Sequence, residues 1–276
     1  MRALGDEERE SVHLTAEQLR VETELFALCA QSEEMWAQYC QLAETHRGTV
    51  INIDLFRDLH PAYAAPGPDR RERRTRLTPA TYRPAKKASR EWYDRLIAES
   101  EPGSVLFTGG GPASGKTRSL SQVFGSYRDA FDRILDTSLT NLVEARTQIE
   151  HASAYGHAVK VVWVYRPFHL AVHSMIERAC TDGRFITLAR MAFLHRGSKE
   201  AFLALGHQYC GSQAVTVQCI INAFEEDDSG ERSLEAAIPL VISDLTRTTE
   251  HVARHAFEQY CQCHTVPEDL ATYLLS

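Results

Sequence analysis

Residues 110–117 combine the residue types that bind a phosphate chain. The segment is Gly110, Gly111, Pro112, Ala113, Ser114, Gly115, Lys116 and Thr117, and it matches the pattern G-x-x-x-x-G-K-[ST] in full. An apolar run at 104–108 precedes it and an amphipathic helical pattern follows it, which disfavours a glycine-rich turn that matches by chance. The glycines let successive backbone N–H groups face an anion at the start of a helix.

The segment therefore predicts a site for ATP or GTP with Mg²⁺. In such a loop the lysine, here Lys116, reaches the β- and γ-phosphates, and the hydroxyl of Thr117 is a ligand of Mg²⁺. We expect Arg118, the next residue, to contact the nucleotide as well.

Asp54 is the second residue with potential for chemistry. It follows a short β-branched run at 49–53, which predicts a buried strand. The carboxyl end of a parallel strand is where α/β proteins place their ligand chemistry, and a carboxylate there can accept a hydroxyl proton and orient Mg²⁺. The alternative is that Asp54 only caps the following helix.

The residues around Asp54 follow the spacing Asn-x-Asp-x-Phe-Arg-x-x-His-Pro-x-Tyr from Asn52 to Tyr63. This spacing resembles the signature of the zeta-toxin kinases, P-loop enzymes that include the toxins of toxin–antitoxin pairs. The resemblance covers about residues 50–210. It implies a kinase that transfers phosphoryl from ATP or GTP to a hydroxyl of a small metabolite, such as a UDP-amino-sugar or another nucleotide-linked sugar.

The resemblance also implies roles for individual residues. Asp54 matches the proposed base and Lys116 the catalytic lysine, while Arg178 and Arg184 match the lid arginines that neutralise the transferred phosphoryl group. The residues expected to bind the acceptor are Asn52, Asp54, Arg57, His60, Asp136 and Thr137. For His60, the residue type and position by themselves favour a structural role at a helix start.

Two features depart from the family pattern. In well-studied members the Asp-bearing strand follows the P-loop, whereas Asp54 precedes it here, and Asp136 stands in place of a glutamate. One interpretation is a permuted strand order with an unchanged site. The other is that Asp54 belongs to an appended segment and that Asp132 or Asp136 is the base. The fourth expected strand ends in Arg166 rather than in an acid, which disfavours motor ATPases and switch GTPases.

The elements that must position these residues alternate between strands and helices. Expected strands at 49–53, 104–108, 133–135, 159–165 and 215–221 are separated by helical patterns. This alternation predicts an α/β fold of the P-loop NTPase type, a mostly parallel sheet with helices on both faces.

Other segments complete the expected organisation. A capping box at Thr15–Gln18 opens an amino-terminal helical hairpin, so we expect an extension over residues 1–48 packed on a kinase-like domain over 49–276. Pro66–Arg76 is expected to be a loop because it is rich in proline and arginine, and Thr81–Glu99 is expected to be helical.

The composition limits the partners. The net charge of -7 over 276 residues argues against nucleic acid as a main partner, although the arginine-rich run at 70–76 leaves open a kinase acting on nucleic-acid ends. No signal peptide or membrane-length apolar run is visible, so we expect a cytoplasmic protein without membrane contact, with signal-independent export left open.

A small-molecule phosphoryl acceptor is the expected partner, and the resemblance adds an antitoxin or inhibitory protein. The amino-terminal hairpin could instead cover the nucleotide site as an antitoxin does, although packing as part of the domain is favoured. A function of another class, a regulatory module that binds a nucleotide without transferring phosphate, also fits the P-loop.

Overall fold

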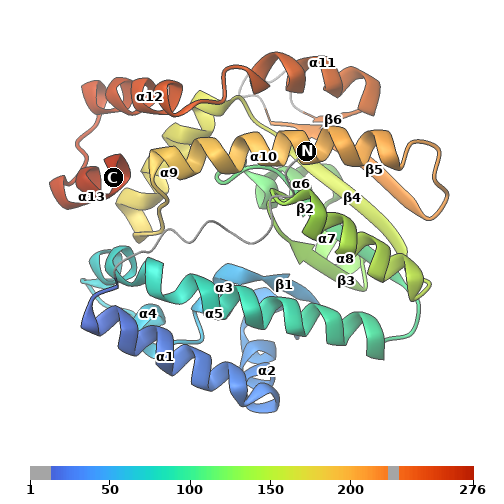
Figure 1. Ribbon diagram of the computed structural model, residues 1–276, viewed down its shortest axis with the longest axis horizontal. Helices are drawn as coiled ribbons and strands as arrows, with labels where there is room; N and C mark the ends of the chain where they lie inside the picture. The colour runs from blue at the N-terminus through green and yellow to red at the C-terminus, as the bar shows by residue number, and fades with distance from the viewer. Residues whose placement is uncertain (1–13, 223–229) are drawn as a thin grey trace.

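The computed structural model describes residues 14–222 and 230–276, and over these residues it is an α/β structure built on one twisted sheet (Figure 1). The strands are β1 (Val50–Asn52), β2 (Ser104–Gly109), β3 (Arg133–Asp136), β4 (Ala158–Tyr165), β5 (Val215–Ile221) and β6 (Gly230–Arg232). Their order in the sheet is β1-β3-β2-β4-β5-β6. The first five run parallel and only β6 is antiparallel to its neighbour β5, which confirms the predicted fold class.

The helices follow the expected alternation with the strands. They are α1 (Ala16–Ala30), α2 (Ser32–Gln41), α3 (Ile53–Arg57), α4 (Pro61–Ala64), α5 (Arg70–Glu99), α6 (Lys116–Phe124), α7 (Tyr127–Ala130), α8 (Leu142–Ala154), α9 (Phe168–Asp182), α10 (Leu188–Gln208), α11 (Leu234–Leu245), α12 (Glu250–Cys263) and α13 (Glu268–Leu275).

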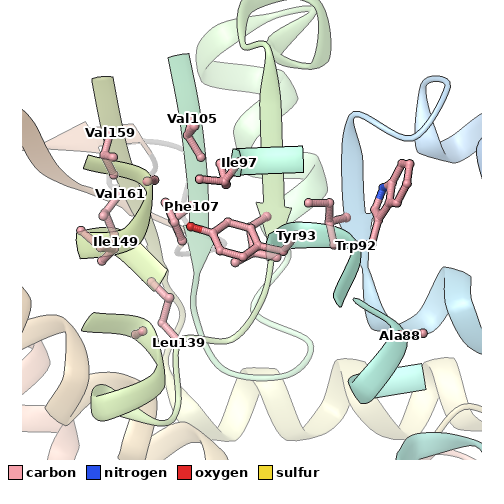
Figure 2. Close-up of a cluster of buried hydrophobic side chains, with 14 of the residues drawn as sticks. Ala88, Trp92, Tyr93, Ile97, Val105, Phe107, Leu139, Ile149, Val159 and Val161 are labelled. Carbon is pink, nitrogen blue, oxygen red and sulfur yellow. The ribbon is translucent and has the colours of Figure 1, made fainter. Parts of the chain in front are cut away.

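Alternate residues of each strand face opposite layers of helices. In β2, Val105 and Phe107 pack with Tyr93 of α5 and Ile149 of α8 (Figure 2), whereas Leu106 packs with α6 and α7 on the other face. Helices α5, α8 and α10 thus cover one face of the sheet and α6 and α7 the other, as a parallel sheet buried on both sides requires.

Helices α1 and α2 form the predicted hairpin. The capping box is present, since Thr15 Oγ1 accepts from the Gln18 amide and the Gln18 side chain accepts from the Thr15 amide. Helix α1 lies along α5, and α2 packs into the core beside β1 (Figure 1). The division into residues 1–48 and 49–276 stays a prediction.

The expected loop at Pro66–Arg76 is wrong in most of its length. Helix α5 begins at Arg70 and continues through Pro79 and Pro84 to Glu99. Its buried side chains contact α1, α3 and α4, and this packing compensates for the hydrogen bonds that the two prolines remove. The prolines of the expected loop, Pro66 and Pro68, precede Arg70, so they do not interrupt the helix that begins there.

Within the part of the chain that the structure describes, none of the helices is long and apolar enough to cross a membrane.

Candidate functional site: a phosphate loop and two carboxylates on one sheet edge

The parallel strands bring the predicted site residues to one edge. Asp54 follows β1, Asp136 ends β3, and the loop from Gly110 follows β2. Because neighbouring strands are spaced by about 4.8 Å, β1, which precedes Asp54, lies about 10 Å from β2, which precedes the phosphate loop. The loop and both carboxylates therefore lie on the same edge of the sheet, with β3 between the outer two strands.

The backbone of the phosphate loop requires its small residues. Gly110, Ala113 and Gly115 all have positive φ, at +127°, +56° and +80°. A Cβ on Gly110 would lie 2.6 Å from the carbonyl oxygen of Val164, so this position has no room for a side chain. The glycines thus allow the loop to curl tightly between β2 and the start of α6 at Lys116.

Side chains from distant elements support this loop. His195 of α10 donates from Nε2 to the carbonyl oxygen of Pro112 at 2.7 Å, and its ring fills the space that a Cβ on Gly111 would need. Asn222, after β5, donates to the Ser114 carbonyl at 2.7 Å. His195 is 2 % exposed, and burial lowers its pKa from 6.5 to about 3, so the ring is neutral.

The loop fits a polyphosphate. The hydroxyl of Ser114 is buried without a hydrogen-bond partner, and Gly115, the N-cap residue of α6, has no side chain to cap the first turn of that helix. Uncapped backbone N–H groups at a helix N-terminus are the groups that bind an anion. The guanidinium of Arg166, at the end of β4, lies beside Gly115, with Nη1 3.6 Å from the position of a Cβ on that glycine.

Lys116 and Thr117 begin α6, next to this cradle, and Arg118 follows on the exposed surface. The donor set suits Mg²⁺, because the Thr117 hydroxyl and the Asp136 carboxylate are both oxygen ligands. Arg118 also contributes to lowering the pKa of Arg166, after the larger effect of burial.

Asp136 is held between the two neighbouring strands. Thr108 of β2 donates its hydroxyl to Oδ1 at 2.8 Å, and Asn52 of β1 donates its amide to Oδ2 at 2.7 Å. The same Asn52 side chain accepts from the backbone N–H of Asp54 at 2.7 Å and so caps α3. Asn52 therefore fixes the two carboxylates relative to each other. The helix cap is Asn52, so Asp54 is not the N-cap of α3.

Arginines surround the Asp54 carboxylate. Arg57 Nη1 lies 3.0 Å from Oδ1, and Arg184 Nη1 lies 3.5 Å from Oδ2. Burial raises the pKa of Asp54, but the charges of Arg57, Arg184 and Arg178 outweigh it and hold the pKa below the ordinary 3.8. Arg57 is itself buried and also donates to Thr81 and to the Thr78 carbonyl, so it positions Asp54.

The two arginines expected on the lid lie on the Asp54 side of the site. Arg178 is on α9, and burial lowers its pKa, with the charge of Asp54 as the largest opposing effect. Arg184 follows α9 and pairs with Asp182, at 2.7 Å from Nη2 to Oδ2, as well as with Asp54. Burial lowers the pKa of Arg184, but Asp182 and Asp54 raise it above its ordinary value.

Gly183 lets this lid segment approach α5. Its φ is +78°, and a Cβ would overlap the carbonyl oxygen of Arg71 and lie 3.0 Å from Thr75 Oγ1. The Thr75 hydroxyl is 3.2 Å from the Gly183 carbonyl. The position of Arg184 over Asp54 thus depends on a residue without a side chain.

Two other predicted residues, His60 and Thr137, have local contacts. His60 is buried, and its ring accepts from the Ala62 amide at 3.2 Å and contacts Glu24 at 3.1 Å. Both ring nitrogens therefore have partners within the protein, and these contacts give no support to a role in acceptor binding. Thr137 accepts from the Leu139 amide at 3.3 Å within the turn after β3.

Asp132 lies at the opposite, amino edge of the sheet. It accepts from the backbone N–H of Ser104 at 2.7 Å and from its hydroxyl at 2.8 Å, before β3 begins. This position, away from the phosphate loop, gives Asp132 no support as the base. The appended segment is not observed, because the strand before Asp54, β1, is a strand of the main sheet.

The arginines at 70–76 form ion pairs on α5 rather than a basic loop. Their partners differ from one arginine to the next: Arg71 pairs with Asp269, Arg73 with Asp69, Arg74 with Asp58 and Arg76 with Glu17. These pairs neutralise much of the charge that suggested an anion patch.

Sequence reasoning missed His195, Asn222 and Thr108. Each is a common residue without a motif, and each reaches the site from an element distant in the chain. The approach of Arg166 to Gly115 could not be predicted either, because it depends on strand order.

Comparison with known proteins agrees with this geometry. Residues 127–234 match the family model described as Zeta toxin, a segment that runs from α7 to the first residue of α11 and includes Asp136, Arg178 and Arg184. No curated protein matches the chain. The matched segment begins after the P-loop and the Asp54 strand, the part of the chain whose order departs from the family pattern. The match indicates a kinase-type function with a P-loop, and it confirms the resemblance of this chain to the zeta toxins.

Proposed function

We propose that this protein is an ATP- or GTP-dependent kinase that phosphorylates a hydroxyl of a small metabolite, such as a UDP-amino-sugar or another nucleotide-linked sugar. The observation that supports it most is the shared edge: the phosphate loop and the carboxylates of Asp54 and Asp136 follow three adjacent strands. The family match over residues 127–234 supports the reaction class.

In the proposed mechanism the nucleotide lies in the phosphate loop with Lys116 on its β- and γ-phosphates. Thr117 would hold Mg²⁺, which would supply positive charge against the phosphates when bound. The acceptor lies between the loop and Asp54. The hydroxyl oxygen of the acceptor attacks the γ-phosphorus while Asp54 takes the hydroxyl proton, and the bond between the γ-phosphorus and the bridging oxygen breaks. Asp136 hydrogen-bonds the acceptor.

The lid arginines complete the proposal. Arg184 pairs with Asp54 before substrates bind, and Arg178 lies close enough to influence that carboxylate. Planar guanidinium groups bind phosphate oxygens strongly, so the transferred phosphoryl group competes with Asp54 for these arginines. A shift of Arg184 toward phosphate would raise the pKa of Asp54 and make it a better proton acceptor at the time of transfer.

The partners follow from the same proposal. The acceptor is a small molecule, and an antitoxin or inhibitory protein is a further partner that the resemblance suggests. We propose that nucleic acid is not a partner, because the net charge is -7 and the arginines at 70–76 are largely ion-paired. We also propose a cytoplasmic location and no membrane partner.

The alternative of a regulatory nucleotide-binding module has one specific observation in its favour. Asp54 is neutralised by arginines and its pKa is lowered, which makes it a weak base in the absence of ligands. The two functions differ in one result: transfer of phosphate to an acceptor, which only the kinase performs.

The test is incubation of the protein with Mg²⁺ and ATP or GTP, together with UDP-N-acetylglucosamine, other nucleotide-sugars or a metabolite extract. Mass spectrometry then measures the gain of one phosphate by an acceptor. Lys116→Ala is the control that must be inactive. If nucleotide binds but wild type and Lys116→Ala give the same product profile, the regulatory module is the correct function.

A further inference from the structure

The outer edge of β1 is covered by a side chain of the amino-terminal hairpin. β1 is the last strand on its side of the sheet, so its outer backbone groups lack a neighbouring strand. The hydroxyl of Tyr39, on α2, donates to the Val50 carbonyl at 2.9 Å and accepts from the Asn52 amide at 3.0 Å. One phenol thus replaces the missing strand at the residue that holds both carboxylates.

The ring of Tyr39 also contacts the chain after Asp54, at Phe56. It stacks on Phe56 of α3 with ring centroids 3.8 Å apart and an angle of 9° between the planes. Tyr39 is completely buried, and burial raises the pKa of its phenol, so the hydroxyl keeps the proton that it donates to Val50. Tyr39 therefore fixes the chain both before and after Asp54.

Asn52 passes this constraint to the site. Its backbone is held by Tyr39, and its side chain binds the Asp54 amide and the Asp136 carboxylate, each at 2.7 Å. A small movement of Asn52 would move both carboxylates relative to the phosphate loop. A transfer reaction tolerates such movement poorly, because a displacement of about 1 Å can cost about a hundredfold in rate.

We propose that Tyr39 is a positioning residue for phosphoryl transfer, so that the amino-terminal helices are a working part of the catalytic site. The inference rests on the proposed kinase function. It assigns the hairpin a role in the geometry of the carboxylates rather than a role as a cover over the nucleotide, and it concerns a segment outside the residues that match the family model.

Tyr39→Phe tests the inference, and Tyr93→Phe is the matched control. The Phe variant keeps the ring on Phe56 and removes only the hydroxyl. Tyr93 belongs to the same buried cluster, and its hydroxyl also donates to a backbone carbonyl, that of Gln148, at 2.5 Å. Gln148 is on α8, far along the chain from Asp54. Both variants should lose stability through a lost buried hydrogen bond.

We expect Tyr39→Phe to lower kcat for acceptor phosphorylation about tenfold while KM for the nucleotide changes less than about twofold. Tyr93→Phe should leave both values unchanged. Equal kcat values in the two variants, or a change confined to KM for the nucleotide, would overturn the proposal.

Hydrogen exchange gives a second result that does not depend on activity. Tyr39→Phe should speed backbone exchange in residues 50–57, whereas Tyr93→Phe should not. If wild type phosphorylates no acceptor, the kinase function fails separately, and the exchange of residues 50–57 still decides whether Tyr39 positions the carboxylates. Unchanged exchange in that segment would refute the role of Tyr39.

Discussion

Nη1 of Arg184 lies 3.5 Å from Oδ2 of Asp54, although 130 positions separate the two residues in the chain. The contact joins the segment after α9 to α3, the helix that follows β1. It links a cation expected on phosphate to a carboxylate expected on the acceptor. The same pair lowers the pKa of Asp54, so the charge state of the site depends on where Arg184 lies.

Asp54→Asn should separate nucleotide binding from transfer. The amide keeps the size of the side chain but cannot accept a proton, so kcat should fall by about a hundredfold or more. The affinity for the nucleotide should change little, because the phosphate loop follows a different strand. Calorimetry measures binding and a product assay measures kcat. Unchanged transfer by Asp54→Asn would remove Asp54 from the mechanism.

Lys116→Ala should reduce both functions of the phosphate loop. The lysine supplies positive charge to the β- and γ-phosphates, and the loss of such a group commonly costs about a hundredfold or more in kcat. Thermal unfolding with and without Mg²⁺ and ATP checks binding, because a ligand that binds only the folded state raises Tm. We expect a clear shift for wild type and a smaller one for Lys116→Ala. Equal shifts would contradict the assignment of Lys116.

Gly183→Ala should displace the lid segment. The new Cβ would overlap the Arg71 carbonyl, and positive φ adds strain of about 1–2 kcal/mol for a residue with a side chain. Gly211→Ala is a close control, because its φ of +76° imposes the same strain while nothing lies within 4 Å of the new Cβ. Gly183→Ala should lower both the free energy of unfolding and kcat. Gly211→Ala should lower only the free energy of unfolding, and only slightly. Equal effects in the two variants would argue against close packing at Gly183.

Acidification should destabilise the fold through His195. Its folded pKa, about 3, lies below the ordinary 6.5, so the unfolded chain binds more protons below pH 6.5. Stability from this residue is present above that pH and is lost as pH falls toward 3, by about 2 kcal/mol between pH 7 and pH 5.

Denaturant unfolding at these two pH values checks the prediction against His195→Gln. Glutamine can still donate a hydrogen bond toward Pro112 but does not titrate, so its unfolding free energy should lose about 2 kcal/mol less over the same interval. Identical losses in both proteins would show that His195 is not the group responsible.

The sequence by itself determined the chemistry of the site in outline. A phosphate loop can be recognised because its geometry needs glycines at fixed spacing before a helix, and Gly110 and Gly115 do have the left-handed backbone that this spacing predicts. The alternation of apolar strands and amphipathic helices likewise predicted the α/β class, because a parallel sheet must be buried on both faces.

Only the tertiary structure decided which residues meet. Strand order places β3 between β1 and β2, and this order brings Asn52 and Thr108 to Asp136. The contacts of Tyr39, His195 and Gly183 likewise join segments far apart in the chain. Local sequence carries no signal for such contacts, because they depend on crossover connections and on the packing of helices on the sheet rather than on neighbouring residues.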